Sequence, residues 1–209
     1  TPVHSYVSMH YCQSVLKFQQ ECMQRKILVS FTLMKSSLVT QGRNLCVAEM
    51  INHPDHYTHL LFIDSDIDFQ CTFQLKVEDP TKIQVEDGVA EVTHAPTGCM
   101  LIKREVIEKM IKHYPELEIY QPTIINGNTE KKENMFNLFD TIHDPKTKRY
   151  FGEDFGFCQR WSDMGGKIHV YLKDYITHVG EYSYCGRFWD DLYQGSQPLK
   201  GVDDSKKIK

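Results

Sequence analysis

The sequence predicts an α/β protein with a mostly parallel central sheet, flanked by helices, and a smaller antiparallel sheet in its second half. In the first half, helix-like and strand-like segments alternate, and this order is typical of parallel sheets with helical crossovers. In the second half, short β-like runs mixed with charged residues favour antiparallel strands. An acidic run follows one apolar strand, at the sheet edge where α/β proteins bind ligands.

Composition restricts the classes of protein to consider. The chain has 209 residues, of which 41% are apolar and 25% charged, as in ordinary globular proteins. Its net charge of −4 makes the chain a poor candidate for nucleic-acid binding, which needs a basic face, so no nucleic-acid partner is expected. The longest apolar stretch, Leu60-Leu61-Phe62-Ile63, is strand-sized, and no membrane span is expected. We expect one domain over residues 1–193, with halves of about 1–68 and 69–193, and a tail or linker over 194–209.

The cysteines indicate a reducing compartment. Seven cysteines are widely spaced, and none forms a C-x-x-C pair. This spacing favours buried, reduced thiols over a disulfide framework or a zinc site. The first residues show no signal peptide, so a cytoplasmic location is expected.

Apolar spacing predicts the elements of the first half. A helix is expected over residues 9–25, with its inner stripe at Cys12, Val15, Leu16, Cys22 and Met23. Residues 27–31 are expected to form a buried strand. A second helix over about 43–52, with Leu45, Ala48 and Ile51 facing inward, should end before Pro54. Residues 58–63 should form the next strand.

The second half is less regular. We expect antiparallel strands over 76–92, a strand over 100–102, and then a helix with a core face of Val106, Ile107, Met110 and Ile111. Residues 121–149 are polar, with a turn at 126–128, and are expected to run over the sheet. A helix over 155–164 should end at Gly165-Gly166, because glycine tolerates the left-handed cap conformation. Residues 168–172 should form the last strand.

Asp64-Ser65-Asp66 is the strongest local motif. Two carboxylates at positions i and i+2 after an apolar strand can converge on Mg²⁺ or Mn²⁺ where the chain turns. The structural alternative is that aspartate simply stabilises the turn. A calcium loop is excluded because Phe69 and Leu75 stand where such a loop needs Gly and Glu.

Two further segments carry candidate chemistry. Glu153 and Asp154 open a helix, where carboxylates either cap the helix or act as a general base. His178 follows the last strand and is either a packed residue or a metal ligand. His53 and His56 are interpreted as surface residues.

The combination of motifs resembles one family. The segments that carry the resemblance are Thr1-Pro2-Val3-His4, Ser36-Ser37-Leu38-Val39, Arg43-Asn44, Leu61-Phe62-Ile63-Asp64-Ser65-Asp66, Ala95-Pro96-Thr97-Gly98-Cys99-Met100-Leu101-Ile102, Gly152-Glu153-Asp154-Phe155-Gly156-Phe157-Cys158 and Thr177-His178-Val179-Gly180. In this order they are similar to GT-A fold glycosyltransferases, and in particular to small glycosyltransferase domains encoded by chloroviruses, the large DNA viruses of algae. The resemblance covers the chain up to about its last fifteen residues.

The resemblance implies a role for each matching position. Asp66, with Asp64 behind it, would hold Mn²⁺ or Mg²⁺, and His178 would add a ligand. The nucleotide-sugar donor would contact Thr1, Pro2, His4, Arg43, Asp64, Ser65, Asp66, Thr97 and Gly98, with Thr97 and Gly98 beside the sugar. Asp154 would be the catalytic base, with Glu153 as its neighbour.

The function implied is inverting, metal-dependent transfer of a sugar from a nucleotide diphosphate, most simply a UDP-sugar, to a hydroxyl of a glycan or glycoprotein. A viral protein of this kind would work in the host cytoplasm, as part of a longer polypeptide. Two departures stand out: residues 69–88 are shorter than the family pattern, and the chain begins where the first strand should be ending. The first implies either a segment absent from this chain or a reduced acceptor side, and the second implies residues upstream of this sequence.

Two other functions fit parts of the pattern. A haloacid-dehalogenase-like phosphatase also places Asp-x-Asp after an apolar strand, but normally after its first strand. A non-catalytic carbohydrate-binding domain would use aromatic residues near the C-terminus for sugar stacking, such as Tyr182, Tyr184, Phe188 and Trp189. Slow Mn²⁺-dependent hydrolysis of a nucleotide sugar would separate the transferase from both.

Overall fold

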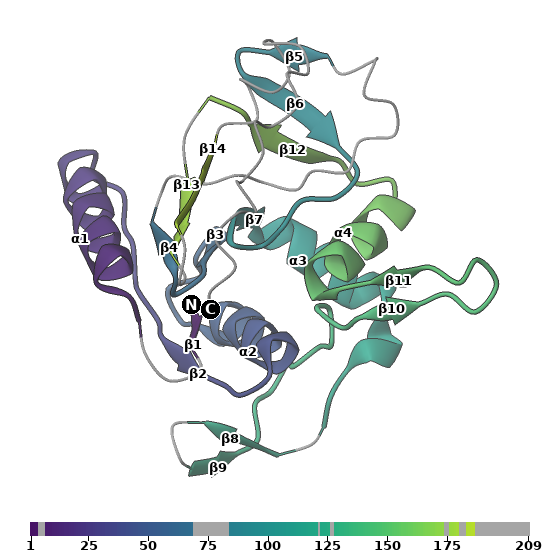
Figure 1. Cartoon of the computed structure of the whole chain (residues 1–209). Coiled ribbons are helices and arrows are strands. Elements are labelled where there is room, and N and C mark those ends of the chain that lie inside the picture. The colour runs from purple at the N-terminus through teal and green to yellow at the C-terminus, as the bar shows by residue number, and fades with distance from the viewer. Residues whose placement is uncertain are drawn as a thin grey trace, which may run out of the picture.

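A computed structural model describes residues 1–3, 7–68, 84–120, 122–125, 128–173, 176–179 and 183–186 (Figure 1). For residues 68, 123–125, 128, 130, 176–179 and 183–186 it describes the backbone alone. The chain is an α/β protein, as predicted. In the part described, no helix is both long and apolar enough to cross a membrane.

Helices and short strands alternate along the chain. The helices are α1 (Met9–Gln24), α2 (Val39–Asn52), α3 (Arg104–His113), α4 (Glu153–Asp163) and a 3-10 turn, η2 (Pro115–Leu117). The strands are β1 (Pro2–Val3), β2 (Met34–Lys35), β3 (His59–Ile63), β4 (Ile67–Asp68), β5 (Val85–Glu86), β6 (Val89–Val92), β7 (Cys99–Lys103), β8 (Thr123–Ile125), β9 (Asn128–Glu130), β10 (Ile142–His143), β11 (Tyr150–Phe151), β12 (Ile168–Tyr171), β13 (Ile176–Val179) and β14 (Ser183–Gly186).

The ladders in the described residues are short and mostly antiparallel. β3 pairs with β7 from His59 opposite Lys103 to Ile63 opposite Cys99. β12 pairs with β6, and β13 pairs with both β14 and β4, all antiparallel. The parallel ladder is β1–β2, two residues long. The described strands therefore form small sheets and not the mostly parallel sheet that the alternating pattern predicted, since β1 and β2 are too short to extend the parallel part.

The strand predicted over residues 27–31 is wrong. After α1, Lys26 adopts a positive φ of 57°, and the backbone N–H of Ile27 donates to the carbonyl of Cys22 (2.8 Å). The chain then runs on as exposed coil, with Leu28 76% exposed, until β2. Phe31 packs edge-on against Phe18 of α1. A short apolar run is compatible with several conformations, and here it has no described strand to pair with.

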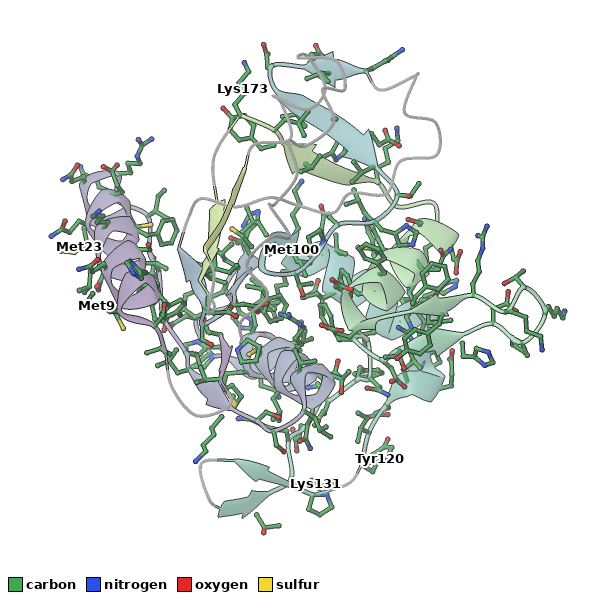
Figure 2. All side chains as sticks on the ribbon, viewed as in Figure 1. Met9, Met23, Met100, Tyr120, Lys131 and Lys173 are labelled. Atoms are coloured by element: carbon green, nitrogen blue, oxygen red, sulfur yellow. The ribbon has the colours of Figure 1, made fainter. Side chains whose placement is uncertain are left out.

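The inner face of α1 also differs from the prediction. Tyr11, Ser14 and Cys22 are buried, whereas Leu16 and Met23 are exposed. Figure 2 shows Met9 and Met23 on the side of α1 that faces away from the rest of the molecule. Tyr11 packs with Ile63 and Ile67, so the contact with β3 and β4 fixes the orientation of α1.

The main core lies between α2, α3 and α4 and the β3–β7 ladder. Its fully buried side chains include Leu45, Val47, Ala48, Phe62, Ile107, Met110, Leu138 and Phe139. The predicted inner faces of α2 and α3 are therefore confirmed. The prediction that residues 121–149 run over the sheet is corrected at 135–139, where Met135, Phe136, Leu138 and Phe139 enter this core. Their spacing follows neither helix nor strand periodicity, which hid them in the sequence.

Two turns have residues with positive φ, and the second of them was predicted. Asp87 and Gly88 have φ of 52° and 83° and join β5 to β6, as a two-residue hairpin turn requires. Gly165 follows α4 with φ of 79°, the predicted left-handed cap. The cysteines with described side chains (Cys12, Cys22, Cys46, Cys99 and Cys158) are free thiols. The predicted turn at 126–127, residues 76–83 and the tail at 194–209 lie outside the described residues.

Asn44 is the polar side chain that ties α2 to the 135–139 segment. It is 1% exposed, donates from Nδ2 to Asn137 Oδ1 (2.7 Å) and accepts at Oδ1 from the backbone N–H of Phe139 (3.0 Å). The segment has no regular ladder of its own here, so these two bonds hold its backbone against the helix.

We predict that Asn44→Ala lowers the free energy of unfolding by about 2–4 kcal/mol, because it leaves a buried N–H unpaired and opens a cavity. Asn52→Ala is the matched control on the same helix, since Asn52 makes its bonds to Glu133 and Asn134 at the surface. It should cost less than about 1 kcal/mol. Urea unfolding of both variants measures the difference, and equal losses would contradict the role given to Asn44.

Candidate functional site

The acidic motif forms a tight turn between β3 and β4. The backbone N–H of Asp64 donates to the carbonyl of Gly98 (2.9 Å), and the N–H of Ile67 donates to the carbonyl of Asp64 (3.0 Å). The carbonyl of Ser65 accepts from the N–H of Ser8, at the start of α1 (3.0 Å). The turn is thus anchored on both sides, and its two carboxylates lie at the end of a buried strand, as the sequence predicted.

Arg43 of α2 binds Asp64 through both ends of its guanidinium. Nη1 donates to Oδ1 and Nη2 to Oδ2, each at 3.1 Å. The arginine side chain is only 3% exposed, and its guanidinium lies 5.4 Å from the ring centre of Phe62. This bidentate geometry is the strongest form of the arginine–carboxylate contact and fixes the plane of the Asp64 carboxylate.

Glu153 reaches the same arginine from α4. Its Oε1 lies 3.6 Å from Arg43 Nε, an ion pair longer than a good hydrogen bond. Nε has no hydrogen-bond partner among the residues that the structure describes. One buried guanidinium therefore joins the turn at 64–66 to the first turn of α4, although these segments are far apart in sequence.

Thr97 and Gly98 lie beside the acidic turn. A Cβ on Gly98 would stand 3.9 Å from Asp64 Oδ2 and 3.5 Å from Ile67 Cδ1, so a small residue leaves space there. Thr97 is 1% exposed, and its hydroxyl has no hydrogen-bond partner in the described part of the chain. Burial, with a smaller contribution from Asp64, raises the pKa of the neighbouring Cys99 thiol to about 11.

Thr1 and Pro2 lie close to the helix turn that carries Arg43. A Cβ on Gly42 would approach Pro2 Cβ to 2.9 Å, so only glycine permits this contact. A hydrogen bond of 2.6 Å joins the hydroxyls of Thr1 and Tyr11. Tyr11 was not among the predicted site residues. Its position on a helix did not indicate that its hydroxyl would meet that of Thr1. His4 lies outside the described residues.

The strand that carries His178 runs beside the acidic turn. In the β13–β4 ladder, His178 stands opposite Ile67 and Thr177 opposite Asp68. The backbone of His178 is thus brought next to the residue that follows Asp66. The side chain of His178 lies outside what the structure describes, and so do the aromatic side chains of residues 182–189.

Asp154 takes a different orientation from Glu153. Its Oδ1 accepts the backbone N–H of Phe155 (2.7 Å) at the start of α4. Burial, with a smaller contribution from Asp154, raises the pKa of the Cys158 thiol to about 11. Both alternatives for Asp154, a cap or a base, are compatible with this position. Arg43 makes its ion pair on α4 with Glu153, whereas Asp154 bonds to the backbone of its own helix.

The described side chains offer few ligands for a divalent cation. Among the described side chains, no three of His, Cys, Asp and Glu are grouped as metal ligands. Both oxygens of Asp64 are bound by Arg43. Asp66 is half-buried on the turn, with the backbone of His178 close by. Carboxylate oxygen and imidazole nitrogen are donor types that Mn²⁺ and Mg²⁺ sites use, and the described structure brings the backbone of His178 beside the turn that carries Asp66.

We predict that Arg43→Met destabilises the fold by about 2–4 kcal/mol, because it leaves two carboxylates next to an apolar side chain. Asp64 and Glu153 are 30% and 22% exposed, so solvent screens part of the loss.

Arg25→Met is the control for this variant, since Arg25 pairs with Glu21 on the exposed surface of α1. It should change the stability by less than about 0.5 kcal/mol. Thermal and urea unfolding measure both. An Arg43→Met protein as stable as the control would show that the cluster does not hold these segments together.

Comparisons of the chain with protein families, with curated proteins and with solved structures found no match.

Proposed function

We propose that this protein is an inverting, metal-dependent glycosyltransferase that moves a sugar from a nucleotide diphosphate, most simply a UDP-sugar, to a hydroxyl of a glycan or glycoprotein. The observation that carries the proposal is the cluster around Arg43. It brings together Asp64 at the end of β3 and Glu153 at the start of α4. These two residues belong to motifs that the resemblance assigns to the donor half and the acceptor half of one site.

A GT-A arrangement is part of this proposal. The acidic turn follows a buried strand, β3, whose antiparallel neighbour β7 begins next to Thr97 and Gly98. β1 and β2 form a parallel pair ahead of it, and Pro2 contacts the helix turn of Arg43. These features favour a nucleotide beside Thr1 and Pro2 with its diphosphate toward the turn. Arg43 is buried, so we propose that it does not contact the donor directly. Its role is to fix the position of the Asp64 carboxylate.

Asp66 and His178 are the residues proposed to hold the divalent cation. When bound, the cation neutralises the charge that builds on the departing diphosphate. Asp64, fixed by Arg43, orients the turn so that Asp66 faces the phosphates. Gly98 keeps the position next to Asp64 free of a side chain, and the sugar ring is proposed to bind on this side of the turn.

Asp154 is the proposed base. One of its carboxylate oxygens removes the proton from the acceptor hydroxyl while the hydroxyl oxygen attacks the anomeric carbon. The bond from that carbon to the diphosphate oxygen breaks, and its electron pair leaves with the nucleoside diphosphate. Attack from the face opposite the leaving group inverts the anomeric configuration. Base catalysis of this kind is worth roughly 10²–10⁴-fold.

The phosphatase alternative fits the cluster less well. In that chemistry the first aspartate of the motif must attack phosphorus with a free carboxylate oxygen. Here each oxygen of Asp64 accepts a hydrogen bond from a buried arginine. A carboxylate held in this way is a weaker nucleophile than one with a free oxygen, so the motif is better suited to charge organisation than to covalent catalysis.

We predict that UDP with Mn²⁺ raises the unfolding temperature of the protein and that Asp66→Asn removes this effect. A ligand at 100 times its Kd stabilises a fold by about 2.7 kcal/mol, which a thermal shift readily detects. Asp66→Asn should unfold at the wild-type temperature without ligand. Asp55→Asn, at an exposed aspartate in the loop after α2, is the control and should keep the full shift. An unchanged shift in Asp66→Asn would remove Asp66 from the metal site.

We predict that Asp154→Asn lowers sugar transfer by roughly 10²-fold or more, with unchanged stability and UDP binding, because the amide can still cap α4 but cannot take a proton. Glu153→Gln, one residue away, keeps Asp154 and should lower transfer by less than about 10-fold. The assay is transfer or slow hydrolysis of UDP-sugars. If Glu153→Gln is inactive and Asp154→Asn has wild-type activity, Glu153 is the base.

A further inference from the structure

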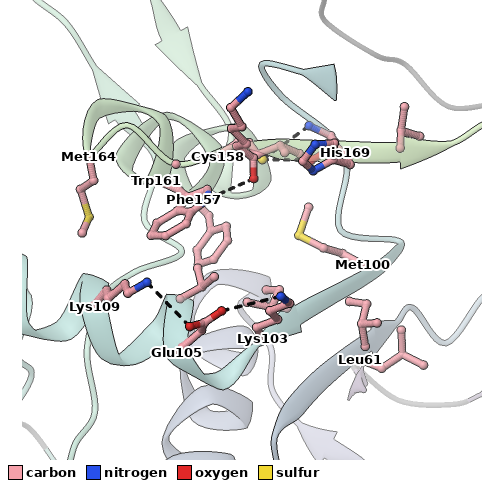
Figure 3. A pocket seen from close by; sticks show the side chains of 18 of the residues that line it. Leu61, Met100, Lys103, Glu105, Lys109, Phe157, Cys158, Trp161, Met164 and His169 are labelled. Atoms are coloured by element: carbon pink, nitrogen blue, oxygen red, sulfur yellow. Dashed lines mark hydrogen bonds and ion pairs between the residues drawn. The ribbon is translucent and has the colours of Figure 1, made fainter. Parts of the chain in front are cut away.

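A cavity of ≈ 1470 Å³ lies between β7, α3, α4 and β12 (Figure 3). Its walls are largely apolar and include Leu61, Met100, Leu101, Val106, Phe157, Trp161, Met164, Ile168 and Val170. Leu101 of β7 is 64% exposed, an unusual state for a large apolar residue in a strand interior. Asp66, Thr97 and Asp154 do not line this cavity, so it is a different feature from the proposed transfer site.

One side of the cavity is an open strand edge. In the β3–β7 ladder the N–H of Asp64 bonds to Gly98, and the N–H of Arg104 bonds to Thr58. Because antiparallel bonding alternates along a strand, the N–H and C=O groups of Cys99, Leu101 and Lys103 point away from β3. In the described part of the chain, no other strand pairs with β7 along this edge. All three residues line the cavity.

The opposite side is also a strand edge. The N–H of Leu172 bonds to the carbonyl of Gly88, which sets the alternation in the β12–β6 ladder. The backbone groups of His169 and Tyr171 therefore point away from β6, and both residues line the cavity. Two rows of hydrogen-bonding groups thus flank one apolar groove, and such edges are templates for another strand.

The rim of the groove is basic, although the chain as a whole carries −4. Its charged lining residues are Lys103, Lys109, Lys112 and Lys167 against Glu105. Glu105 pairs with both Lys103 and Lys109 at 3.7 Å, and Lys167 pairs with Glu91 at 2.8 Å, all at the surface. The lysines favour a ligand with acidic groups, and the apolar floor favours apolar groups. A ligand in which acidic and apolar side chains alternate would satisfy both.

We propose that this groove binds an extended acidic–apolar peptide segment of a partner protein, which adds as a strand to the open edge of β7. A strand satisfies the backbone groups of residues 99, 101 and 103, places alternate apolar side chains on the groove floor and sets its carboxylates among the lysines. An anionic amphiphile would match the charge and the floor but would leave the backbone groups unbonded. The proposal does not depend on sugar transfer.

The probe is a labelled peptide of four Glu-Val repeats, titrated with the protein in a fluorescence anisotropy assay. We expect saturable binding, at least 10-fold weaker binding of a Lys-Val peptide of the same length, and at least 10-fold weaker binding when alternate peptide nitrogens are methylated. Methylation removes the N–H donors on one edge of the peptide and keeps its charge and side chains. Binding that is equal for the methylated peptide, or no binding of the Glu-Val peptide, would overturn the proposal.

Two variants locate the site. Leu101→Pro removes an N–H that points into the groove and keeps every β3–β7 bond, because proline is tolerated at an open edge. Lys112→Glu reverses a charge on the exposed rim. Each variant should weaken binding of the Glu-Val peptide at least 5-fold. Lys17→Glu, on the exposed surface of α1, should leave the binding unchanged.

If Leu101→Pro does not fold, Lys112→Glu and the methylated peptide still decide the question. Wild-type peptide affinity in Lys112→Glu would contradict the proposal. Oleate is titrated in parallel. If oleate binds and the Glu-Val peptide does not, the groove is a site for an anionic amphiphile and the proposal is wrong.

Discussion

The burial of the Arg43 guanidinium is the constraint on which the candidate site depends. A charged group that is 3% exposed is strongly destabilising unless carboxylates neutralise it, so Arg43 requires Asp64 and Glu153 at their observed positions. The bidentate contact sets the plane of the Asp64 carboxylate, and through it the turn that carries Asp66. The same arginine holds the start of α4. The ion-pair cluster and the arrangement of the candidate site thus depend on the same contacts.

Packing around this cluster explains why its geometry is fixed. Arg43 stands on α2, whose next residues include Leu45, Val47 and Ala48, all fully buried, so the helix cannot rotate without opening the core. Phe62 lies under the guanidinium and also packs edge-on against Phe139. The 135–139 segment therefore holds the Phe62 ring against which the arginine packs. Sites on rigid elements hold their side chains more precisely than sites on loops, and this one combines a rigid arginine with a short anchored turn.

Part of this arrangement is predictable from the sequence. The strand before Asp64 and the core face of α3 follow from apolar periodicity, and the cap at Gly165 follows from glycine's tolerance of positive φ. Residues 27–31 were predicted wrongly because an apolar run says nothing of whether a partner strand exists. The Arg43–Asp64–Glu153 contacts join positions whose separation carries no periodic signal, so the motifs predicted that these residues matter but not how they meet. The groove beside β7 was not predicted either, because an open edge depends on strand order.

The central claim is that this site activates a nucleotide sugar for inverting transfer. Proton NMR of UDP-glucose incubated with the protein and Mg²⁺ tests it most directly, because the anomeric proton distinguishes the two configurations of the released sugar before they equilibrate in water. UDP-galactose and UDP-N-acetylglucosamine are included in the same series. These donors are α-linked, so an inverting enzyme should release UDP and the β-anomer first from at least one of them. Release of the α-anomer, or stability of every donor in the presence of the protein, would contradict it.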